Sequence, residues 1–302
     1  SAQQVRVARD GIPLDGALFG ASDVGSLPLD GISRVELYRG FIPVRFGGAT
    51  IGGVLNVVGQ GRVREEVESA WLGVGSFAGR EAGVAAALPW SEHHSVRVRW
   101  GYAASEGNFS FFDDGNTPAI PTDDGLSVRR NNDYSRMAGS MRWDWRRGKW
   151  SAFAEGLAGF KEQGIAGRGS AQARETRLFT SEGRVLARID RRSFGGPGGR
   201  LSWLASAGTS LRSFADPLGE VGLGVDDQET TGYDLYLSPR MRLPIWREGF
   251  VELTSDLRFE DLRVQEAVAP SADFRATFPV NPSVTMTSAP PREISLPSTN
   301  PL

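Results

Sequence analysis

The feature that most constrains the fold is an alternation of apolar and polar residues that recurs between residues 65 and 266. In one such segment, Val96, Val98 and Trp100 alternate with Arg97 and Arg99. A period of two residues is typical of a β-strand with one apolar and one polar face. The sequence predicts nine strands of this kind, near residues 65–77, 80–90, 94–107, 132–146, 150–163, 174–191, 200–215, 227–243 and 249–266.

The connections between these segments alternate in length. The short ones fall at 91–93, 147–149, 193–199 and 244–249, and the longer ones at 108–131, 164–173 and 216–226, with a brief exception at 78–79. Trp90, Trp145, Trp150 and Trp246 lie beside the short connections. Short turns on one side, long loops on the other and a girdle of tryptophans are typical of an outer-membrane β-barrel.

A soluble β-sandwich with tryptophans in its core is the alternative that this pattern leaves open, because the signal of a single membrane strand is weak. Composition narrows the choice only a little. The net charge of −2 gives no reason to expect a nucleic acid as partner. No apolar run approaches the ~18 residues that a transmembrane helix requires.

A second pattern precedes the strands, from Gly31 to Val58. Ile32, Val35 and Leu37 alternate with polar residues, a glycine-rich turn follows, and the apolar run 54–58 ends the pattern. Short, β-branched apolar runs around a glycine loop predict two strands joined by a turn.

This stretch resembles the C-terminal half of the plug domain of TonB-dependent outer-membrane receptors. That family has a pattern close to I-E-R-V-E-V-L-R-G-P, then L-Y-G, then A-x-G-G-V-I-N-I-V. Residues 32–40, 45–47 and 50–58 match these three parts in order, and residues 10–14 and 27–31 match text further upstream. Phe41 ahead of Pro43, and Phe46 in place of a tyrosine, depart from the pattern.

The resemblance implies an all-β fold, a partial membrane β-barrel with an α+β plug remnant. We expect residues 1–61 to be the C-terminal part of the plug, and residues 62–302 to be the N-terminal part of the barrel, ending in an extracellular loop. About nine antiparallel barrel strands would then be present of the ~22 in a plugged transporter. The periplasmic box that contacts TonB would lie outside this chain.

The resemblance also implies a function, which is TonB-dependent transport of a scarce nutrient across the bacterial outer membrane. A ferric siderophore is the expected ligand, with cobalamin or an oligosaccharide as alternatives, and surface recognition or signalling without import as the rival function. The expected partners are outer-membrane lipid, TonB and a small molecule such as a metal chelate. No enzyme activity and no cofactor are expected.

Two sets of residues are candidates for the inside of such a barrel. In the family, the arginine that Arg39 matches pairs with barrel glutamates, so Arg39, Glu36 and Arg34 are candidate contacts between plug and barrel. The second set shares the polar face of the predicted strands and would face the lumen: Arg97, Arg99, Arg142, Glu155, Glu252, Arg258 and Glu260.

The long connection after the third strand supplies two further candidates. Phe109, Phe111 and Phe112 would line the mouth of a ligand site, or pack against neighbouring loops. Carboxylates there could bind Ca²⁺, as in an equivalent loop of the cobalamin-transporting branch, although ordinary turn chemistry is the favoured explanation. The carboxylates are Asp113, Asp114, Asp123 and Asp124.

Overall fold

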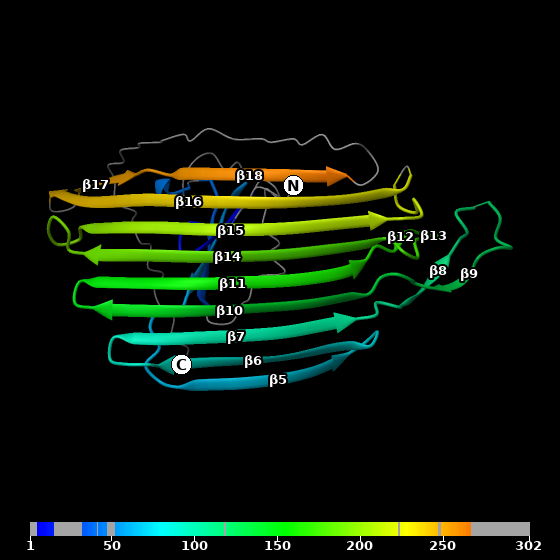
Figure 1. The fold of residues 1–302 in the computed structure, drawn as a ribbon, viewed down its shortest axis with the longest axis horizontal. Helices are drawn as coiled ribbons and strands as arrows, with labels where there is room; N and C mark the ends of the chain where they lie inside the picture. Colours follow the sequence, from blue (N-terminus) through cyan, green and yellow to red (C-terminus); the bar gives the residue numbers. More distant parts are fainter. Residues whose placement is uncertain are drawn as a thin grey trace, which may run out of the picture.

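The computed structural model describes residues 5–14, 32–40, 42–46, 52–117, 119–222, 224–246 and 249–266. These residues form two main β-sheets, a large antiparallel one that we call the wall and a small one that we call the N-terminal sheet (Figure 1). Among them, no helix is long and apolar enough to span a membrane. The fold is all-β, as the alternation predicted.

The wall contains ten described strands, each antiparallel to its neighbours. They are β5 (Val67–Gly75), β6 (Gly79–Pro89), β7 (His94–Ser105), β10 (Tyr134–Arg147), β11 (Trp150–Gly164), β14 (Arg177–Arg192), β15 (Arg200–Asp216), β16 (Asp226–Trp246), β17 (Gly249–Thr254) and β18 (Leu257–Glu266). Strands from β5 to β16 pair with their neighbours in the order of the chain, and both β17 and β18 pair with β16.

The first eight predicted strands each correspond to one strand of the wall, whereas the ninth is two, β17 and β18. Both halves keep one register on β16, with Arg240 opposite Thr254 and Leu237 opposite Leu257. The ladder breaks between them where Pro239 has no N–H to donate. Its carbonyl oxygen still accepts from the Ser255 N–H, at 3.2 Å.

Two short hairpins lie in the longer connections and were not predicted. They are β8 (Ser110–Asp113) with β9 (Gly125–Val128), and β12 (Gly167–Arg168) with β13 (Ala171–Gln172). Both lie at the same end of the wall in Figure 1. The short turns after β6, β10 and β14 lie at the other end, as the predicted division into a turn side and a loop side requires, and the brief turn between β5 and β6 lies on the loop side as the expected exception.

The two faces of the wall differ in character. The outer face presents exposed apolar side chains, including Leu72, Val84, Trp100, Met137, Met141, Phe160, Val185, Trp203, Leu235 and Phe259. The inner face carries the polar residues of the alternating pattern, among them Arg142, Glu155 and Ser206, all buried. An apolar belt on one face with charges on the other is the arrangement that a lipid bilayer and a polar lumen impose on a barrel strand.

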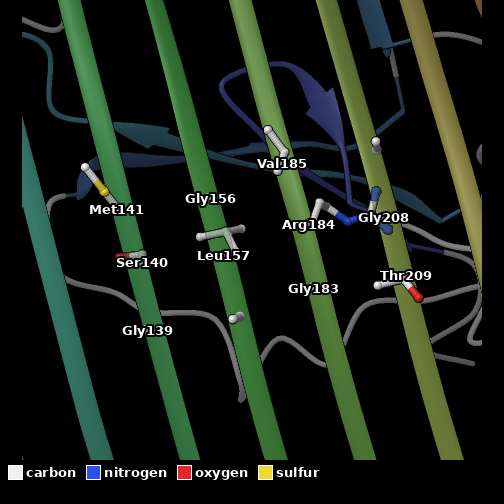
Figure 2. Close-up of a pocket in the computed structure, with 12 residues that line it drawn as sticks. Gly139, Ser140, Met141, Gly156, Leu157, Gly183, Arg184, Val185, Gly208 and Thr209 are labelled. Carbon is white, nitrogen blue, oxygen red and sulfur yellow. The ribbon is translucent and has the colours of Figure 1, made fainter.

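The outer face is hollowed over β10, β11, β14 and β15, where each strand contributes small residues (Figure 2). The depression has a volume of about 650 Å³. Gly139, Gly156 and Gly183 line it, with Met141 and Val185 as the larger side chains. In this view the N-terminal sheet lies behind the wall.

The N-terminal sheet contains β1 (Val5–Arg9), β2 (Ile12–Pro13), β3 (Ile32–Tyr38) and β4 (Gly53–Gly59), in the order β2-β1-β4-β3. β1 is parallel to β4, and the other pairs are antiparallel. The predicted pair in Gly31–Val58 is therefore β3 and β4. The described part of residues 1–61 also holds a three-residue 3₁₀ turn, Val44–Phe46, as its single helical element.

Gly53 shows why the glycine-rich turn needs glycine. Its φ is +125°, and a Cβ there would lie 2.6 Å from the Tyr38 carbonyl oxygen. No L side chain fits that space or favours that backbone conformation.

The hydrophobic core lies between the two sheets. Val7 and Ile12 of the N-terminal sheet pack with Phe153, Leu186, Leu204 and Tyr236 of the wall. Burying these side chains against each other fixes the N-terminal sheet on the inner face, with the turn between β1 and β2 held against the wall.

Candidate functional site

The turn between β1 and β2 is the point where the N-terminal sheet meets the charged residues of the wall. Arg9 pairs with Ile12 across a two-residue connection, Asp10-Gly11. Both residues have positive φ, 51° and 82°. Asp-Gly is among the sequences that favour such a tight turn, because aspartate tolerates this conformation and glycine adopts it without strain.

The backbone of this turn is bound from both sides. The Arg188 guanidinium donates to the Asp10 carbonyl oxygen at 3.0 Å, and the Arg240 guanidinium donates to the Gly11 carbonyl oxygen at 3.2 Å. The Gly11 N–H donates to Asn56 Oδ1 of β4 at 2.9 Å. The turn is therefore held by two wall strands and by its own sheet.

The Asp10 carboxylate bridges the two sheets. Its Oδ2 accepts from Arg142 Nη1 of β10 at 2.5 Å, and its Oδ1 accepts from the Gly59 N–H of β4 at 3.0 Å. Gly59 leaves room for this contact, since a Cβ there would lie 2.9 Å from Arg142 Nη1 and 3.0 Å from Asp10 Oδ2.

Arg9 forms the second bridge. Its Nε and Nη2 donate to Glu155 Oε2 and Oε1 of β11, at 2.7 and 2.6 Å. The two side chains are only 3% and 1% exposed. A bidentate geometry of this kind gives the strongest arginine–carboxylate pairing, and it fixes direction as well as distance.

These two bridges belong to one group of side chains, which we call the anchoring network. Arg142 also contacts Glu155 at 3.2 Å and Asp144 at 3.1 Å, and Asp144 accepts from Arg97 at 2.8 Å. The network thus contains three cations and three anions: Arg9, Arg97, Arg142, Asp10, Asp144 and Glu155. Burying charge is costly unless each charge is paired, and here each one is.

An aromatic ring supports the centre of the network. The Arg142 guanidinium lies 3.9 Å from the centroid of the Phe153 ring. The face of an aromatic ring attracts a cation, so Phe153 both belongs to the core and stabilises the arginine.

The chemistry of this site is the attachment of one sheet to another. The charges are balanced, the hydrogen bonds are directional, and the partners lie 132 and 146 residues apart in the chain. Removing one partner leaves a buried charge without compensation, at a cost of about 3–5 kcal/mol. The site therefore holds the N-terminal sheet strongly while it is intact, and weakly once one member is displaced.

The structure brings together three of the residues that were predicted to face the lumen, Arg97, Arg142 and Glu155. Arg99 also lies on the inner face, with its guanidinium 4.7 Å from the centroid of the Trp71 ring. Arg258 and Glu260 pair with each other on β18 at 2.5 Å. Glu252 lies on β17, opposite Arg242.

The predicted contacts Arg34, Glu36 and Arg39 occupy the far edge of the N-terminal sheet. Arg34 pairs with Glu36 at 2.7 Å, Glu36 also accepts from Asn56 and Tyr38, and Arg39 is exposed. Partial burial by itself would raise the pKa of Glu36, but the hydrogen bonds from Asn56, Arg34 and Tyr38 hold it below the usual value. A role for these three in holding a plug stays a prediction.

Sequence reasoning missed Arg9, Asp10 and Gly11 as contacts with the wall. One signal was available. Val5, Val7 and Arg9 share one face of β1, and Val7 packs in the core, so a charged residue continues an apolar face. A charge in such a position needs a buried partner.

The predicted loop residues lie on the β8–β9 hairpin or beside it. Phe109 and Phe112 are 39% and 66% exposed, and Phe111 packs edge-on against Phe109. Asp113 and Asp114 accept backbone N–H groups two residues further on, and Asp123 accepts the Thr117 hydroxyl. Within the described residues, no three acidic or histidine side chains are placed to hold a metal ion. Oxygens of Asp113, Asp114 and Asp123 thus stabilise the local turns, and the calcium site considered from the sequence stays a prediction.

Comparison with known proteins gives an independent view of the chain. The TonB-dependent Receptor Plug Domain family matches residues 1–54. The Vitamin B12 transporter BtuB of Vibrio cholerae is 31% identical over 107 residues, which is 35% of this chain and 18% of the relative. The same transporter from Photobacterium profundum is 31% identical over 121 residues, 38% of this chain and 20% of the relative. The matched region thus spans about a fifth of the curated relatives.

Solved structures resemble the whole described fold. The Copper transporter OprC covers 92% of this chain with a TM-score of 0.66 and 13% identity, and the match takes in 42% of that chain. The siderophore receptor PirA from Acinetobacter baumannii covers 87% with a TM-score of 0.63 and 15% identity, over 41% of that chain. At such identities the likeness is one of fold, a wall of barrel strands with a small sheet on its inner face.

Proposed function

We propose that this chain is part of a TonB-dependent receptor, a plugged barrel of the bacterial outer membrane that imports a scarce nutrient, because the plug-domain family matches residues 1–54 and the vitamin B12 transporters resemble about a third of the chain. Residues 1–61 belong to the plug in this proposal, and the chain from residue 62 onward belongs to the barrel. The wall then faces lipid with its apolar outer face and encloses the N-terminal sheet with its inner face.

The observation that carries the proposal is the anchoring network. Arg9 and Asp10 extend from the N-terminal sheet to Glu155 and Arg142 of the wall, and all four side chains are buried. A plug has to close the barrel at rest and move when a ligand is carried through. A balanced network of directional charge pairs suits both states, since it is strong when complete and is broken by displacing one member.

The work of such a receptor is binding and passage, not catalysis. The ligand binds on the loop side. TonB acts from the turn side, through a segment outside the described residues, and draws the plug out of position. The Asp10-Gly11 turn is fixed by residues of β10, β14 and β16, so rearrangement of the plug has to break these contacts or proceed around them.

A ferric siderophore is the ligand class that we propose. The fold of this chain is shared with proteins described as siderophore receptors, and the sequence relatives are vitamin B12 transporters, which makes cobalamin the main alternative. Recognition of a molecule at the surface without import is the rival function.

The test is uptake by the full-length receptor in cells that lack their own receptors. Accumulation of radiolabelled ferric siderophores and of cobalamin is measured with and without TonB. We expect one of the ferric chelates to accumulate, and accumulation to stop when TonB is removed while surface binding persists. Binding without accumulation in either background would establish the recognition-only function instead.

A further inference from the structure

Three cations of β10, β11 and β15 lie in one cross-strand row of the wall. They lie near the start of β10 and the ends of β11 and β15, which Figure 1 shows on the side of the hairpins β8–β9 and β12–β13. Arg136 of β10 is directly opposite Lys161 of β11, Lys161 is opposite Thr180 of β14, and Thr180 is opposite Arg212 of β15. We call Arg136, Lys161 and Arg212 the basic row.

The register places this row on the face that carries the N-terminal sheet. Arg136 is six residues from Arg142 on the same strand, with no shift in register between them, so both side chains leave the same face. Six residues of strand span about 20 Å. The basic row therefore lies well to the loop side of the anchoring network.

The stability of the sheet does not explain two members of the row, Lys161 and Arg212. Like charges directly opposite each other on neighbouring strands destabilise a sheet, and Arg136 faces Lys161 in this way. Elsewhere on the inner face, Arg142, Arg184 and Arg188 each pair with an acidic side chain. Within the described residues, Lys161 and Arg212 have no ion pair or side-chain hydrogen bond.

Small residues lie beside the row. The adjoining cross-strand row, one step toward the anchoring network, contains Ala138, Gly159, Glu182, Ser210 and Gly232. Among the described residues, a Cβ placed on Gly159 would approach only the Met137 carbonyl oxygen, at 3.9 Å. Two acidic side chains stand in these rows against three cations: Glu182, and Glu81 of β6, which lies two strands from Arg136 through Ala103.

From this arrangement we propose that the basic row is an anion-binding site for the imported ligand, which would carry at least two acidic groups. The inference rests on the proposed function, since it takes the inner face as the path of the ligand. Lys161 and Arg212 hold the acidic groups from either side of Thr180, and Arg136 adds to the positive potential. The lumen walls strengthen this attraction, because low-dielectric surroundings focus the field of charges in a cleft.

The proposal predicts that the ligand of this receptor is anionic and not uncharged. A ferric chelate whose donor arms leave carboxylate groups unengaged fits the row. A ligand without net negative charge gains nothing from Lys161 and Arg212 and leaves two cations uncompensated next to it.

The test uses the full-length receptor in detergent and calcein, a xanthene dye with two iminodiacetate arms, as the probe. Binding is followed by fluorescence anisotropy for the parent protein and for the double variant Lys161→Gln/Arg212→Gln. The matched control is Arg146→Gln, which removes a cation from the same face of β10 ten residues away. A rhodamine dye of similar size without net negative charge serves as the second probe.

We expect the double variant to lose about tenfold or more in calcein affinity, since a hydrogen bond to a charged group is worth at least about this factor. The control variant and the rhodamine dye should change by less than about twofold, and calcein binding by the parent should weaken with added salt. Lys161→Arg should retain binding, which separates charge from the particular side chain.

The proposal is overturned if calcein does not bind the parent protein, if the double variant binds it as the parent does, or if Arg146→Gln loses as much. These outcomes are independent of the uptake test. The receptor could accumulate its ligand in a TonB-dependent way while the double variant binds calcein as the parent does. In that case the proposed function stands and the proposed anion site is wrong. The variants are expected to fold, because neither side chain makes a bond that the sheet needs, and the gel shift of the heated protein checks this.

Discussion

Arg9 and Glu155 form a bidentate ion pair across 146 residues of chain, with two donor–acceptor distances of 2.7 and 2.6 Å. Their side chains are 3% and 1% exposed. One belongs to the first strand of the N-terminal sheet and the other to the middle of the wall. This pair, together with Asp10 and Arg142, decides how firmly the two sheets are joined.

Replacing Glu155 by glutamine should loosen the N-terminal sheet. The change keeps the shape of the side chain but leaves Arg9 and Arg142 short of negative charge in a buried site, at a cost of about 3–5 kcal/mol. A fluorescent label placed in β1 of the full-length protein would report detachment of this sheet in urea. We expect its transition to move to lower urea, while the transition of the wall stays in place.

Two further variants test whether charge balance is the reason. Glu162→Gln removes an acid from the same strand that is 51% exposed and pairs with Arg177, so it should change the label transition very little. Arg9→Met combined with Glu155→Leu removes both charges of the pair, and it should recover much of the loss seen with Glu155→Gln. An equal loss in all three variants would contradict the role given to the buried pair.

Gly208→Ala should break a second ion pair of the wall. Arg184 and Asp234 lie on the strands either side of Gly208 and pair at 2.7 Å across it. In Figure 2 the Arg184 side chain points toward Gly208. A Cβ there would lie 2.6 Å from Asp234 Oδ1 and 2.7 Å from Arg184 Nη2, so the pair has to separate.

We expect this substitution to cost about 2 kcal/mol, the contribution of a hydrogen-bonded charge pair that is mostly buried. The temperature at which the folded gel band is lost should fall accordingly. Gly156→Ala is the control, because nothing lies within 4 Å of a Cβ at Gly156. If Gly208→Ala loses the folded gel band at the same temperature as the parent protein, the absence of a side chain at Gly208 is not what allows Arg184 and Asp234 to pair.

The sequence predicted the wall well, and the interface poorly, for a physical reason. Alternation reports which face of a strand is polar, and it placed Arg97, Arg142 and Glu155 on one face, where the structure brings them into one network. It does not report which residue of a distant strand a side chain meets, because that depends on the register and on the docking of the N-terminal sheet. The contacts of Arg9 and Asp10 with the wall were therefore not predicted, although an arginine on the same face as Val5 and Val7 indicated a buried charge that needs a partner.

The break between β17 and β18 coincides with a lapse in the alternation, because Thr254, Ser255 and Asp256 are three polar residues in a row. The apolar set Leu253 and Leu257 keeps one face across this lapse, so a single strand was predicted, and the second contribution lies on the neighbouring strand, at Pro239. Alternation describes a single strand, whereas a hydrogen-bonded ladder depends on the residues of both neighbouring strands.

Lowering the pH should weaken the edge of the N-terminal sheet at β3. Hydrogen bonds from Asn56, Arg34 and Tyr38 hold the pKa of Glu36 below its ordinary value of 4.5 in the folded protein. A carboxylate with a depressed folded pKa contributes stability above its unfolded pKa, and this contribution is lost as pH falls through the folded value. The effect should be modest, since Glu36 is near the surface.

Hydrogen exchange of the β3 and β4 amides at pH 7 and near pH 3, corrected for intrinsic rates, measures this effect. Protection should fall at the lower pH in the parent protein, and Glu36→Gln should show the reduced protection at both values. A parent protein with equal protection at the two values would exclude Glu36 as the titrating group.

Asp216 should control whether the loops at one end of the wall behave as a unit. Its carboxylate is fully buried and accepts the Thr176 hydroxyl at 2.9 Å, together with the N–H groups of Glu220 and Val221, both at 2.8 Å. Glu220 in turn accepts the N–H groups of Arg174 and Glu175. The two carboxylates thus fasten the connection after β15 to the connection before β14.

Replacing Asp216 by alanine removes the acceptor for several donors at once, and each buried donor left unsatisfied costs about 1–3 kcal/mol. We expect both connections to become accessible to limited proteolysis, although only one carries the change. Glu220→Ala should release residues 174 and 175 but leave the turn after Asp216 intact, because Asp216 still holds the Val221 N–H. Cleavage confined to residues 217–225 in the Asp216→Ala variant would mean that the two connections are independent, and that the contact through Thr176 and Glu220 does not couple them.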